Sequence, residues 1–189
     1  MLIAITGGIG SGKSEVLKII KKYAGNVLSA DEINRELLKK SDYVKRLLAA
    51  FPEAAAGGGV DKKILAGIVF SDGEKRKILN ALAHPLIAEI IRDRTALTKG
   101  NVFVEIPLIT ESGTRGMFDK VWVVVSDKNI KTERLKTARG MSEKEIFAVM
   151  NAQLDDGAYT ENADAVIENN AGKDGLERKV KKLLDGLNT

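Results

Sequence analysis

The sequence predicts an α/β fold built on a five-stranded parallel sheet with helices packed against it. Short apolar runs alternate along the chain with longer segments of helical periodicity, and this alternation is typical of parallel sheets covered by helices. Val121–Val125 is a continuous run of valines and one tryptophan, as expected of a strand that is buried on both faces. The 189 residues are enough for one compact domain with a small appendage.

Five short runs are predicted to be strands. Each is rich in apolar residues. Four are followed at once by glycine, proline or a polar side chain, which are common where strands end, and Asn26–Ser29 reaches Asp31 one residue later. Leu2–Thr6 opens the series and runs directly into a group of glycines. The predicted strands are Leu2–Thr6, Asn26–Ser29, Asn101–Ile106, Val121–Val125 and Ala165–Glu168.

The segments between these strands carry helical patterns. A first helix follows the glycines, with apolar residues from Val16 to Ile20 at helical spacing. Arg139-Gly140 separates two of the later helices. The other predicted helices are Glu32–Lys40, Tyr43–Ala50, Lys62–Phe70, Glu74–Thr98, Ile130–Ala138, Ser142–Asp155 and Leu176–Leu187.

Two features are expected to interrupt the helical middle of the chain. Proline at His84-Pro85 removes a backbone donor and restricts the residue before it, so we expect the helix Glu74–Thr98 to break there. Three consecutive glycines end the segment Phe51–Gly59 and do not fit inside a helix, so we expect a mobile loop.

Composition narrows the classes of function. Without cysteine the chain has no disulfide, thiolate metal site or cysteine nucleophile. The net charge of +4 comes from intermixed acidic and basic residues, so we expect no nucleic-acid partner. No stretch approaches the roughly 20 apolar residues of a membrane span, and no signal peptide is apparent. We expect a cytoplasmic protein, a monomer in preference, with small-molecule ligands.

Gly7–Ser14 fits the phosphate-binding pattern G-x-x-x-x-G-K-[ST] between a predicted strand and a predicted helix, the context that this motif requires. Its glycines let backbone N–H groups converge on phosphate oxygens, and the following helix adds its positive dipole end. Lys13 is expected to reach the β- and γ-phosphates of ATP, and the Ser14 hydroxyl to bind Mg²⁺. The predicted nucleotide-binding residues of the loop are Gly8, Ile9, Gly10, Ser11, Gly12, Lys13 and Ser14.

The loop alone leaves kinases, GTPases, ATPases and motor domains open. The chain has no N-K-x-D guanine-reading tetrapeptide, and it is short for a multidomain ATPase. A small kinase needs a carboxylate near the acceptor hydroxyl, a mobile acceptor-binding segment and a lid that carries arginines. The chain offers candidates for each of these parts.

Asp31 is the candidate carboxylate, because it stands just beyond the second predicted strand, where open α/β sheets bind ligands. It can accept or orient the proton of an attacking hydroxyl, or it can instead cap the following helix. Its position leaves the two roles equally open. Arg35, one turn later, either faces the same cleft or is a solvated helix residue.

Arg134 and Arg139 are candidates for a lid that closes over the triphosphate, where guanidinium groups neutralise developing charge. The alternative is a surface helix with ion pairs to Glu133 or Glu143. His84, the one histidine, is either a structural hydrogen-bonding residue or a contact for an anionic acceptor. A second histidine or a cysteine to complete a protein metal site is absent from the sequence, so Mg²⁺ would be held mainly by phosphates, Ser14 and water.

Taken in order, these motifs resemble the dephospho-coenzyme A kinase family over nearly the whole chain. Ile5–Ser14 resembles the family's form of the phosphate loop, Ala30–Ile33 its acidic motif, and His84–Ile87 its H-P-x-I signature. Further matching segments are Arg35–Leu37, Leu65 with Ile68–Phe70, Leu79-Asn80, Pro107–Ile109 with Glu111, Asp119–Val124, Arg134-Leu135, Arg139, Gln153, Ala163-Asp164 and Val166–Asn169.

The resemblance implies a three-layer P-loop kinase fold with a five-stranded parallel sheet, a helical acceptor-binding subdomain and a lid. It places the core at about 1–38, 100–138 and 163–189, the CoA-binding subdomain at about 39–99 and the lid at about 139–162. It also implies the reaction: ATP, with Mg²⁺, phosphorylates the 3′-hydroxyl of the ribose in dephospho-CoA, which is the last step of CoA synthesis.

The same resemblance implies a role for each candidate residue. Asp31 would be the base or orienting carboxylate, Arg139 would act from the lid, and Asn169 would lie against adenine within Val166–Asn170. The implied catalytic residues are Asp31, Lys13 and Arg139, and the implied acceptor-binding residues are Asp31, Arg35, His84 and Pro107.

The chain also departs from the family pattern, which bears on acceptor affinity and lid contacts. The departures are Glu15, Lys62, Thr110, Lys131 and Gly140. Two alternatives stay open: a P-loop kinase with a nucleoside, nucleotide or other small metabolite as acceptor, and a non-catalytic nucleotide-binding switch. The His84-Pro85 signature disfavours the first, and the combination of Lys13, Asp31 and Arg139 disfavours the second.

Overall fold

The computed structural model describes residues 1–106, 115–151, 153, 156–161 and 163–187, and the chain divides into two compact units. The sheet unit comprises Met1–Leu28 and Lys99–Thr189, and the helical unit comprises Ser29–Thr98. The boundary after Leu28 assigns the helix that follows the second strand to the helical unit. The sequence had suggested a core that continues to about residue 38.

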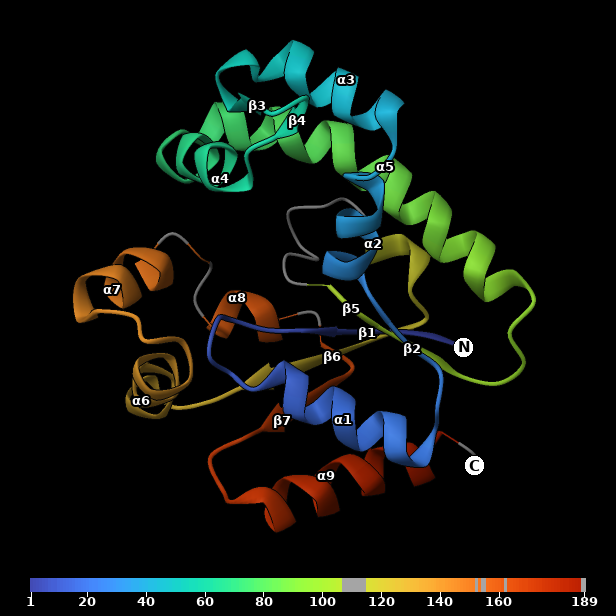
Figure 1. The fold of residues 1–189 in the computed structure, drawn as a ribbon. Coiled ribbons are helices and arrows are strands. Elements are labelled where there is room, and N and C mark those ends of the chain that lie inside the picture. The colour runs from blue at the N-terminus through green and yellow to red at the C-terminus, as the bar shows by residue number, and fades with distance from the viewer. Residues whose placement is uncertain (107–114, 152, 154–155, 162, 188–189) are drawn as a thin grey trace. The chain divides into compact units, whose positions relative to one another are not determined.

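The sheet unit is built on a five-stranded sheet with the order β2-β5-β1-β6-β7 (Figure 1). The central strand β1 pairs in parallel with both neighbours, Ile3 opposite Phe103 on one side and Ile5 opposite Trp122 on the other. The five predicted strands are thereby confirmed. Their bounds are β1 Leu2–Thr6, β2 Val27–Ser29, β5 Val102–Glu105, β6 Lys120–Val125 and β7 Ala165–Glu168.

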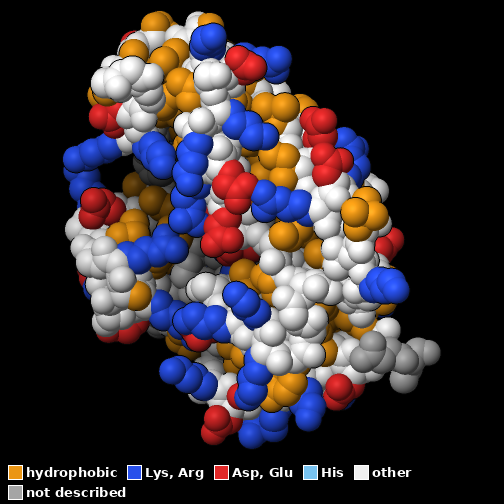
Figure 2. Space-filling model, turned by 45° about the vertical axis from the view of Figure 1, so that its right-hand side comes forward, with side chains coloured by type: hydrophobic (Ala, Val, Ile, Leu, Met, Phe, Trp, Pro, Cys, Tyr) orange, Lys and Arg blue, Asp and Glu red, His pale blue; other side chains and the backbone are white. Residues whose placement is uncertain are grey.

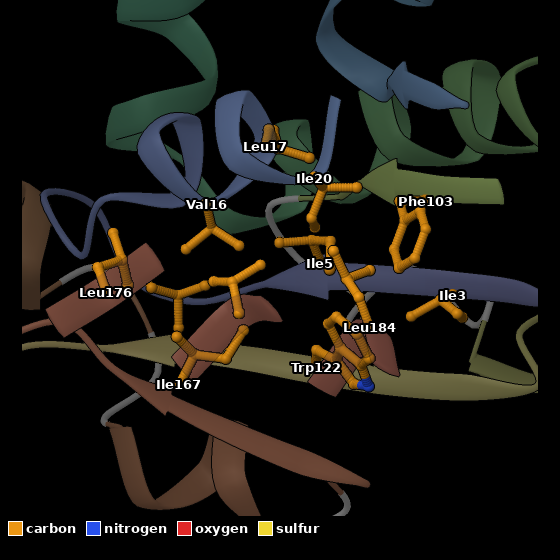
Figure 3. Packing of buried hydrophobic residues seen from close by; sticks show 12 residues of the cluster. Ile3, Ile5, Val16, Leu17, Ile20, Phe103, Trp122, Ile167, Leu176 and Leu184 are labelled. Atoms are coloured by element: carbon orange, nitrogen blue, oxygen red, sulfur yellow. The ribbon is translucent and has the colours of Figure 1, made fainter. Parts of the chain in front are cut away.

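One face of this sheet is covered by α1 (Lys13–Tyr23) and α9 (Lys173–Asp185), which lie side by side (Figure 1). Figure 3 shows side chains of the layer between the sheet and these two helices, with Val16 and Ile20 of α1 on one side and Trp122 beside Leu184 of α9. Trp122 is 2% exposed and its ring lies 5.5 Å from that of Phe103. This packing anchors α1, and hence the loop that precedes it, to the sheet.

Three further helices complete the sheet unit, and a short 3₁₀ turn, Arg115–Met117, precedes β6. The helices are α6 Lys128–Arg139, α7 Glu143–Asn151 and α8 Asp156–Thr160. Gly140 ends α6 in the left-handed conformation (φ 62°), which confirms the predicted break. The predicted helix Ser142–Asp155 corresponds only to α7, and its residues 152, 154 and 155 lie outside the described residues.

The helical unit contains α2 (Ala30–Leu37), α3 (Ser41–Ala50), a 3₁₀ turn (Pro52–Ala54), α4 (Lys62–Ser71) and α5 (Gly73–Ala96). The long helix α5 packs against α2, α3 and α4. Asp61 and Asp72 cap α4 and α5, because each carboxylate accepts two backbone N–H groups of the following turn. The core of the unit consists of Ile33, Leu37, Tyr43, Leu47, Phe51, Leu65, Ala83, Ile87 and Ile91.

The expected break at His84-Pro85 is wrong, since α5 is helical through Pro85. Proline there removes the backbone hydrogen bond to the carbonyl of Ala81. The buried residues Ala83, Ile87 and Ile91 hold the helix against its neighbours on both sides of the proline. Packing therefore outweighs a local loss of about 3 kcal/mol.

The segment predicted to be a mobile loop, Phe51–Gly59, has regular structure instead. After the 3₁₀ turn, β3 (Ala55–Ala56) and β4 (Gly59–Val60) form an antiparallel hairpin. Its two turn residues, Gly57 and Gly58, have φ of 53° and 80°, the left-handed values of a tight two-residue hairpin turn. Glycines that exclude a helix thus form a hairpin turn.

Charged side chains of both signs occur together on the surface, and Figure 2 shows acidic groups among the lysines and arginines of one face. Exposed ion pairs such as Lys18–Glu15 and Lys77–Glu74 account for part of this mixture. None of the helices in the described ranges is long and apolar enough to cross a membrane.

Candidate functional site

The Gly7–Ser14 loop connects β1 to α1, and two of its glycines are required by close approach. A Cβ on Gly7 would lie 2.2 Å from the carbonyl oxygen of Val124, and one on Gly12 would lie 2.1 Å from Nδ2 of Asn169. Both glycines also have positive φ, 139° and 94°, which L-residues avoid. These two glycines are therefore pressed against the ends of neighbouring strands.

Lys13 folds back over the loop that it follows. Its ammonium group donates to the carbonyl oxygens of Gly7 at 2.7 Å and of Gly8 at 3.1 Å. These bonds place a positive charge at the loop, where a triphosphate would sit. Ser14 follows in the first turn of α1 and is exposed.

The back of the loop rests on a buried polar network centred on Arg134. Its guanidinium donates to Ser126 Oγ and to the Asn169 carbonyl, each at 2.9 Å, and to the Ser11 carbonyl at 3.3 Å. Asn169, 3% exposed, adds a bond from Nδ2 to the same Ser11 carbonyl at 2.9 Å. Three elements thus hold one loop carbonyl: α6, the end of β6 and the end of β7.

The front half of the loop is held by Gln153, which lies between α7 and α8. Its Oε1 accepts the backbone N–H of Ile9 at 2.8 Å, and the side chain is half-buried. A residue 144 positions away in the sequence therefore touches the phosphate loop directly.

Beside this network lies a cavity of about 440 Å³ beyond the ends of β6 and β7. At its wall Asp127 and Asn170 form a reciprocal pair: the Asp127 N–H donates to Oδ1 of Asn170, and Nδ2 of Asn170 donates to Oδ1 of Asp127, both at 2.9 Å. The lining residues are Val125, Ser126, Asp127, Lys128, Gly157, Thr160, Glu168 and Asn170.

Asp31 lies in the helical unit as the second residue of α2. The N-cap position belongs to Ser29, and no side chain caps this helix, so the alternative of Asp31 as a helix cap is wrong. The Asp31 side chain is exposed, and within the described ranges its carboxylate has no hydrogen-bond or ion-pair partner. Arg35, one turn on, donates from Nε to the backbone oxygen of Asp31 at 3.4 Å and pairs with Glu32 at 3.8 Å.

The predicted lid arginines have different surroundings. Arg134 lies beneath the loop, and among the described residues it makes no ion pair to Glu133 or Glu143. Arg139 is the exposed last residue of α6. The ion pair across Gly140 is made by Lys136 with Glu143; it raises the pKa of Lys136 and lowers that of Glu143, mainly through their side-chain hydrogen bond.

Two further residues, His84 and Pro107, are predicted to contact the acceptor. His84 is half-buried within α5 of the helical unit. Pro107 lies outside the described residues, as does Thr110. The structure therefore brings together the loop residues and Asn169 in the sheet unit, and Asp31 with Arg35 on α2.

Sequence reasoning missed Ser126 and Asp127, included Asn170 only as the end of the stretch Val166–Asn170, and gave Gln153 no contact. Ser126-Asp127 directly follows the strand β6, and Asn170 follows the strand β7. Polar residues at adjacent strand ends meet at one sheet edge, so this position was the available signal. Nothing in the pattern marks Gln153 as a partner of Ile9.

Solved structures with the same fold define the class. A protein from Thermus thermophilus superimposes with a TM-score of 0.87 at 32% identity, over 99% of this chain and 97% of that one. A shikimate kinase from Acinetobacter baumannii, solved with shikimate, reaches 0.61 at 18% identity over 98% and 92%, and it bears on the fold alone. Fold and phosphate loop together place this chain among the proteins with a P-loop kinase fold.

Sequence relatives identify the family. The model of the dephospho-CoA kinase family matches residues 1–174. Dephospho-CoA kinases of Thermus thermophilus and Geobacillus kaustophilus are each 35% identical, covering 97% of this chain and 90% and 95% of their own lengths. A solved dephospho-CoA kinase from Campylobacter jejuni has a TM-score of 0.70 at 28% identity over 98% and 96% of the two chains. The chain belongs to the dephospho-CoA kinase family.

Proposed function

We propose that this chain transfers the γ-phosphoryl group of ATP to the 3′-hydroxyl of the ribose in dephospho-CoA, the last step of CoA synthesis. The observation that carries the proposal is the phosphate loop, held by Lys13 above and by Arg134 and Asn169 behind, in a chain of this family. A flexible glycine turn would need no such network.

The loop and the cavity beside it form the donor site in this proposal. The loop N–H groups and Lys13 bind the β- and γ-phosphates. The adenine lies in the cavity at the ends of β6 and β7, against the chain around Asn169 and Asn170. Because the Asn169 amide is bonded to the loop carbonyl of Ser11, the residue links the two halves of the site.

The residues present also fit Mg²⁺. Ser14 supplies an exposed hydroxyl directly after Lys13, and hydroxyl, phosphate and water oxygens are the ligands that this hard cation prefers. The described ranges hold no cluster of three or more histidine, cysteine or carboxylate side chains for a metal. When bound, the ion would neutralise phosphate charge.

For the acceptor we propose that the free Asp31 carboxylate takes or orients the proton of the 3′-hydroxyl. The ribose oxygen bonds to the γ-phosphorus as the bond to the β–γ bridging oxygen breaks, and ADP leaves. Arg139 stabilises the charge of the transferred group from the lid. Arg35 and His84 contact the anionic acceptor. We place this reaction in the cytoplasm and assign it to a monomer, which light scattering of the purified protein can check.

Product analysis by mass tests the proposal. The protein is incubated with Mg-ATP and, in turn, dephospho-CoA, AMP, GMP, uridine or shikimate. We expect a phosphorylated product from dephospho-CoA alone. Turnover of another acceptor in its place would reassign the acceptor, and ATP binding without any turnover would favour a nucleotide-binding switch.

The Asp31→Asn variant tests the proposed catalytic carboxylate. Loss of the proton acceptor should lower kcat by about 10²-fold or more with ATP affinity nearly unchanged. Lys13→Ala is the control in the donor site and should lower both kcat and the affinity for ATP. Full activity of Asp31→Asn would show that the carboxylate is not needed.

A further inference from the structure

We propose that Gln153 is a positioning residue of the phosphate loop, which holds the peptide between Gly8 and Ile9 so that its carbonyl faces the ammonium group of Lys13. The inference rests on the proposed ATP site but not on the identity of the acceptor. It gives a function to a side chain that the reaction itself does not use.

Two side chains hold the two ends of one peptide group. The N–H of Ile9 donates to Oε1 of Gln153 at 2.8 Å, and the carbonyl of Gly8 accepts from Nζ of Lys13 at 3.1 Å. These two groups belong to the same planar peptide and point in opposite directions. Fixing the N–H end therefore also fixes the direction of the carbonyl that Lys13 contacts.

This peptide needs an external partner to keep its orientation. It follows Gly7 and Gly8, and glycine leaves both signs of φ open, so the peptide can rotate at low cost. A rotated peptide would turn the Gly8 carbonyl away from Lys13. The lysine reaches the phosphates effectively only when it is already directed to them, because ordering it on binding costs affinity.

Gln153 is suited to this task by its place. It belongs to neither α7 nor α8, and its own backbone N–H donates to the carbonyl of Met150 at 3.3 Å, which leaves the side chain to reach the loop. Its neutral amide supplies an acceptor without adding a negative charge beside the triphosphate. The bond thus ties the chain between α7 and α8 to the loop that binds ATP.

A double-mutant cycle with Lys13 tests the proposal, with the affinity for Mg-ATP measured by calorimetry on the full chain. Gln153→Met keeps the length of the side chain and removes the acceptor, and we expect it to weaken ATP binding about 5-fold, as expected for loss of one hydrogen bond. In the Lys13→Met background the same change should alter affinity less than about 2-fold, because the lysine to be positioned is gone.

A control variant separates positioning from a general structural effect. Asn151→Ala, at the exposed end of α7, is the matched control and should leave affinity unchanged. The urea midpoint from Trp122 fluorescence shows whether each variant is folded.

Two results would overturn the proposal: wild-type affinity in Gln153→Met, or an equal loss of affinity in both Lys13 backgrounds. Since the readout is ATP affinity, these results are independent of the acceptor. A wild-type protein that binds ATP but does not phosphorylate dephospho-CoA would refute the proposed function. The double-mutant cycle of Gln153 and Lys13 would still test the positioning role, because it measures only ATP affinity.

Discussion

Arg134 holds the phosphate loop from behind through the carbonyls of Ser11 and Asn169 and the hydroxyl of Ser126. The planar guanidinium can donate to all three at once because its N–H groups form a fixed fork. Replacing it would remove one donor from each of these groups and leave only Ser126 Oγ on the Asn169 carbonyl, with Asn169 Nδ2 and Ser126 Oγ on the Ser11 carbonyl. The loop would then lose part of its support on the side away from the nucleotide.

We expect Arg134→Met to lower the free energy of unfolding of the sheet unit by about 2–3 kcal/mol and to weaken Mg-ATP binding. Arg134→Lys should recover only part of the lost stability and part of the lost Mg-ATP affinity, since one ammonium group cannot reach all of these acceptors. Urea unfolding followed by Trp122 fluorescence measures the first effect and calorimetry the second. Arg178→Met, at an exposed position of α9, is the control, and equal behaviour of the two methionine variants would contradict the prediction.

At the scale of single residues, the local sequence pattern identified the phosphate loop but not the residues from other segments that hydrogen-bond to it. Lys13 and the glycines are identified by spacing alone, because the motif is contiguous and its chemistry is local. Arg134 is a lid candidate in the sequence because it precedes a segment that could close over the triphosphate, yet in the structure it donates to the Ser11 carbonyl of the loop. Gln153 and Ser126 reach the loop from distant segments, and only the fold brings such residues together.

The helix α5 shows how tertiary packing changes the effect of a local signal. Proline at position 85 costs one backbone hydrogen bond, and the buried face with Ala83, Ile87 and Ile91 compensates for it. The sequence correctly gave the period of this helix. It could not show that partners on three other helices would hold it together.

Replacing this proline should therefore stabilise the helical unit. We expect Pro85→Ala to raise its free energy of unfolding by about 1–3 kcal/mol, because alanine restores the hydrogen bond and the helix propensity. Urea unfolding followed by far-UV circular dichroism measures the change. Pro52→Ala is the control, since Pro52 is the first residue of its 3₁₀ turn, where proline is well tolerated. Unchanged stability of Pro85→Ala would show that Pro85 does not destabilise the helix.

The contact between α2 and α3 depends on Tyr43, which is 3% exposed and donates its hydroxyl to Oδ1 of Asn34 at 3.1 Å. Burial raises the pKa of this hydroxyl above the ordinary value of 10.0, because it disfavours the charged form. Above pH 10 the unfolded chain loses this proton before the folded chain does. The folded state then binds more protons, so stability falls as the pH rises.

We expect the stability of the helical unit to decrease as the pH rises above about 10, with a contribution from Tyr43 of at most about 1.4 kcal/mol per pH unit. Tyr43→Phe should lack this contribution, and it should be about 1 kcal/mol less stable at pH 7 through the lost hydrogen bond. Urea midpoints at pH 8 and pH 10.5 for both proteins measure the difference. Parallel pH profiles for the two would contradict the assignment.

The whole molecule consists of a sheet unit into which the helical unit is inserted. The chain leaves the sheet unit after Leu28 and returns at Lys99, and the strands on either side of the insertion, β2 and β5, are neighbours in the sheet. The sheet can therefore close without the inserted helices. Each unit has its own buried core, so we expect two separate unfolding transitions.

The single tryptophan makes this testable, because Trp122 is buried in the core of the sheet unit, whereas circular dichroism reports helices of both units. Leu47→Ala, in the core of the helical unit at 1% exposure, should lower the dichroism midpoint by the equivalent of about 2–5 kcal/mol. It should leave the Trp122 midpoint in place. Val180→Ala, in the sheet unit, is the matched variant: it should lower the Trp122 midpoint and leave in place the part of the dichroism change that comes from the helical unit.

Mg-ATP should distinguish the two unfolding transitions by stabilising one of them, because the proposed donor site belongs entirely to the sheet unit. At a concentration 100-fold above its Kd, the nucleotide should stabilise the transition reported by Trp122 by about 2.7 kcal/mol and leave the remaining dichroism change where it was. Superimposed transitions from both probes, with Leu47→Ala and with nucleotide alike, would show one cooperative unit. ATP binding would then be coupled to the folding of the acceptor helices as well as to that of the sheet.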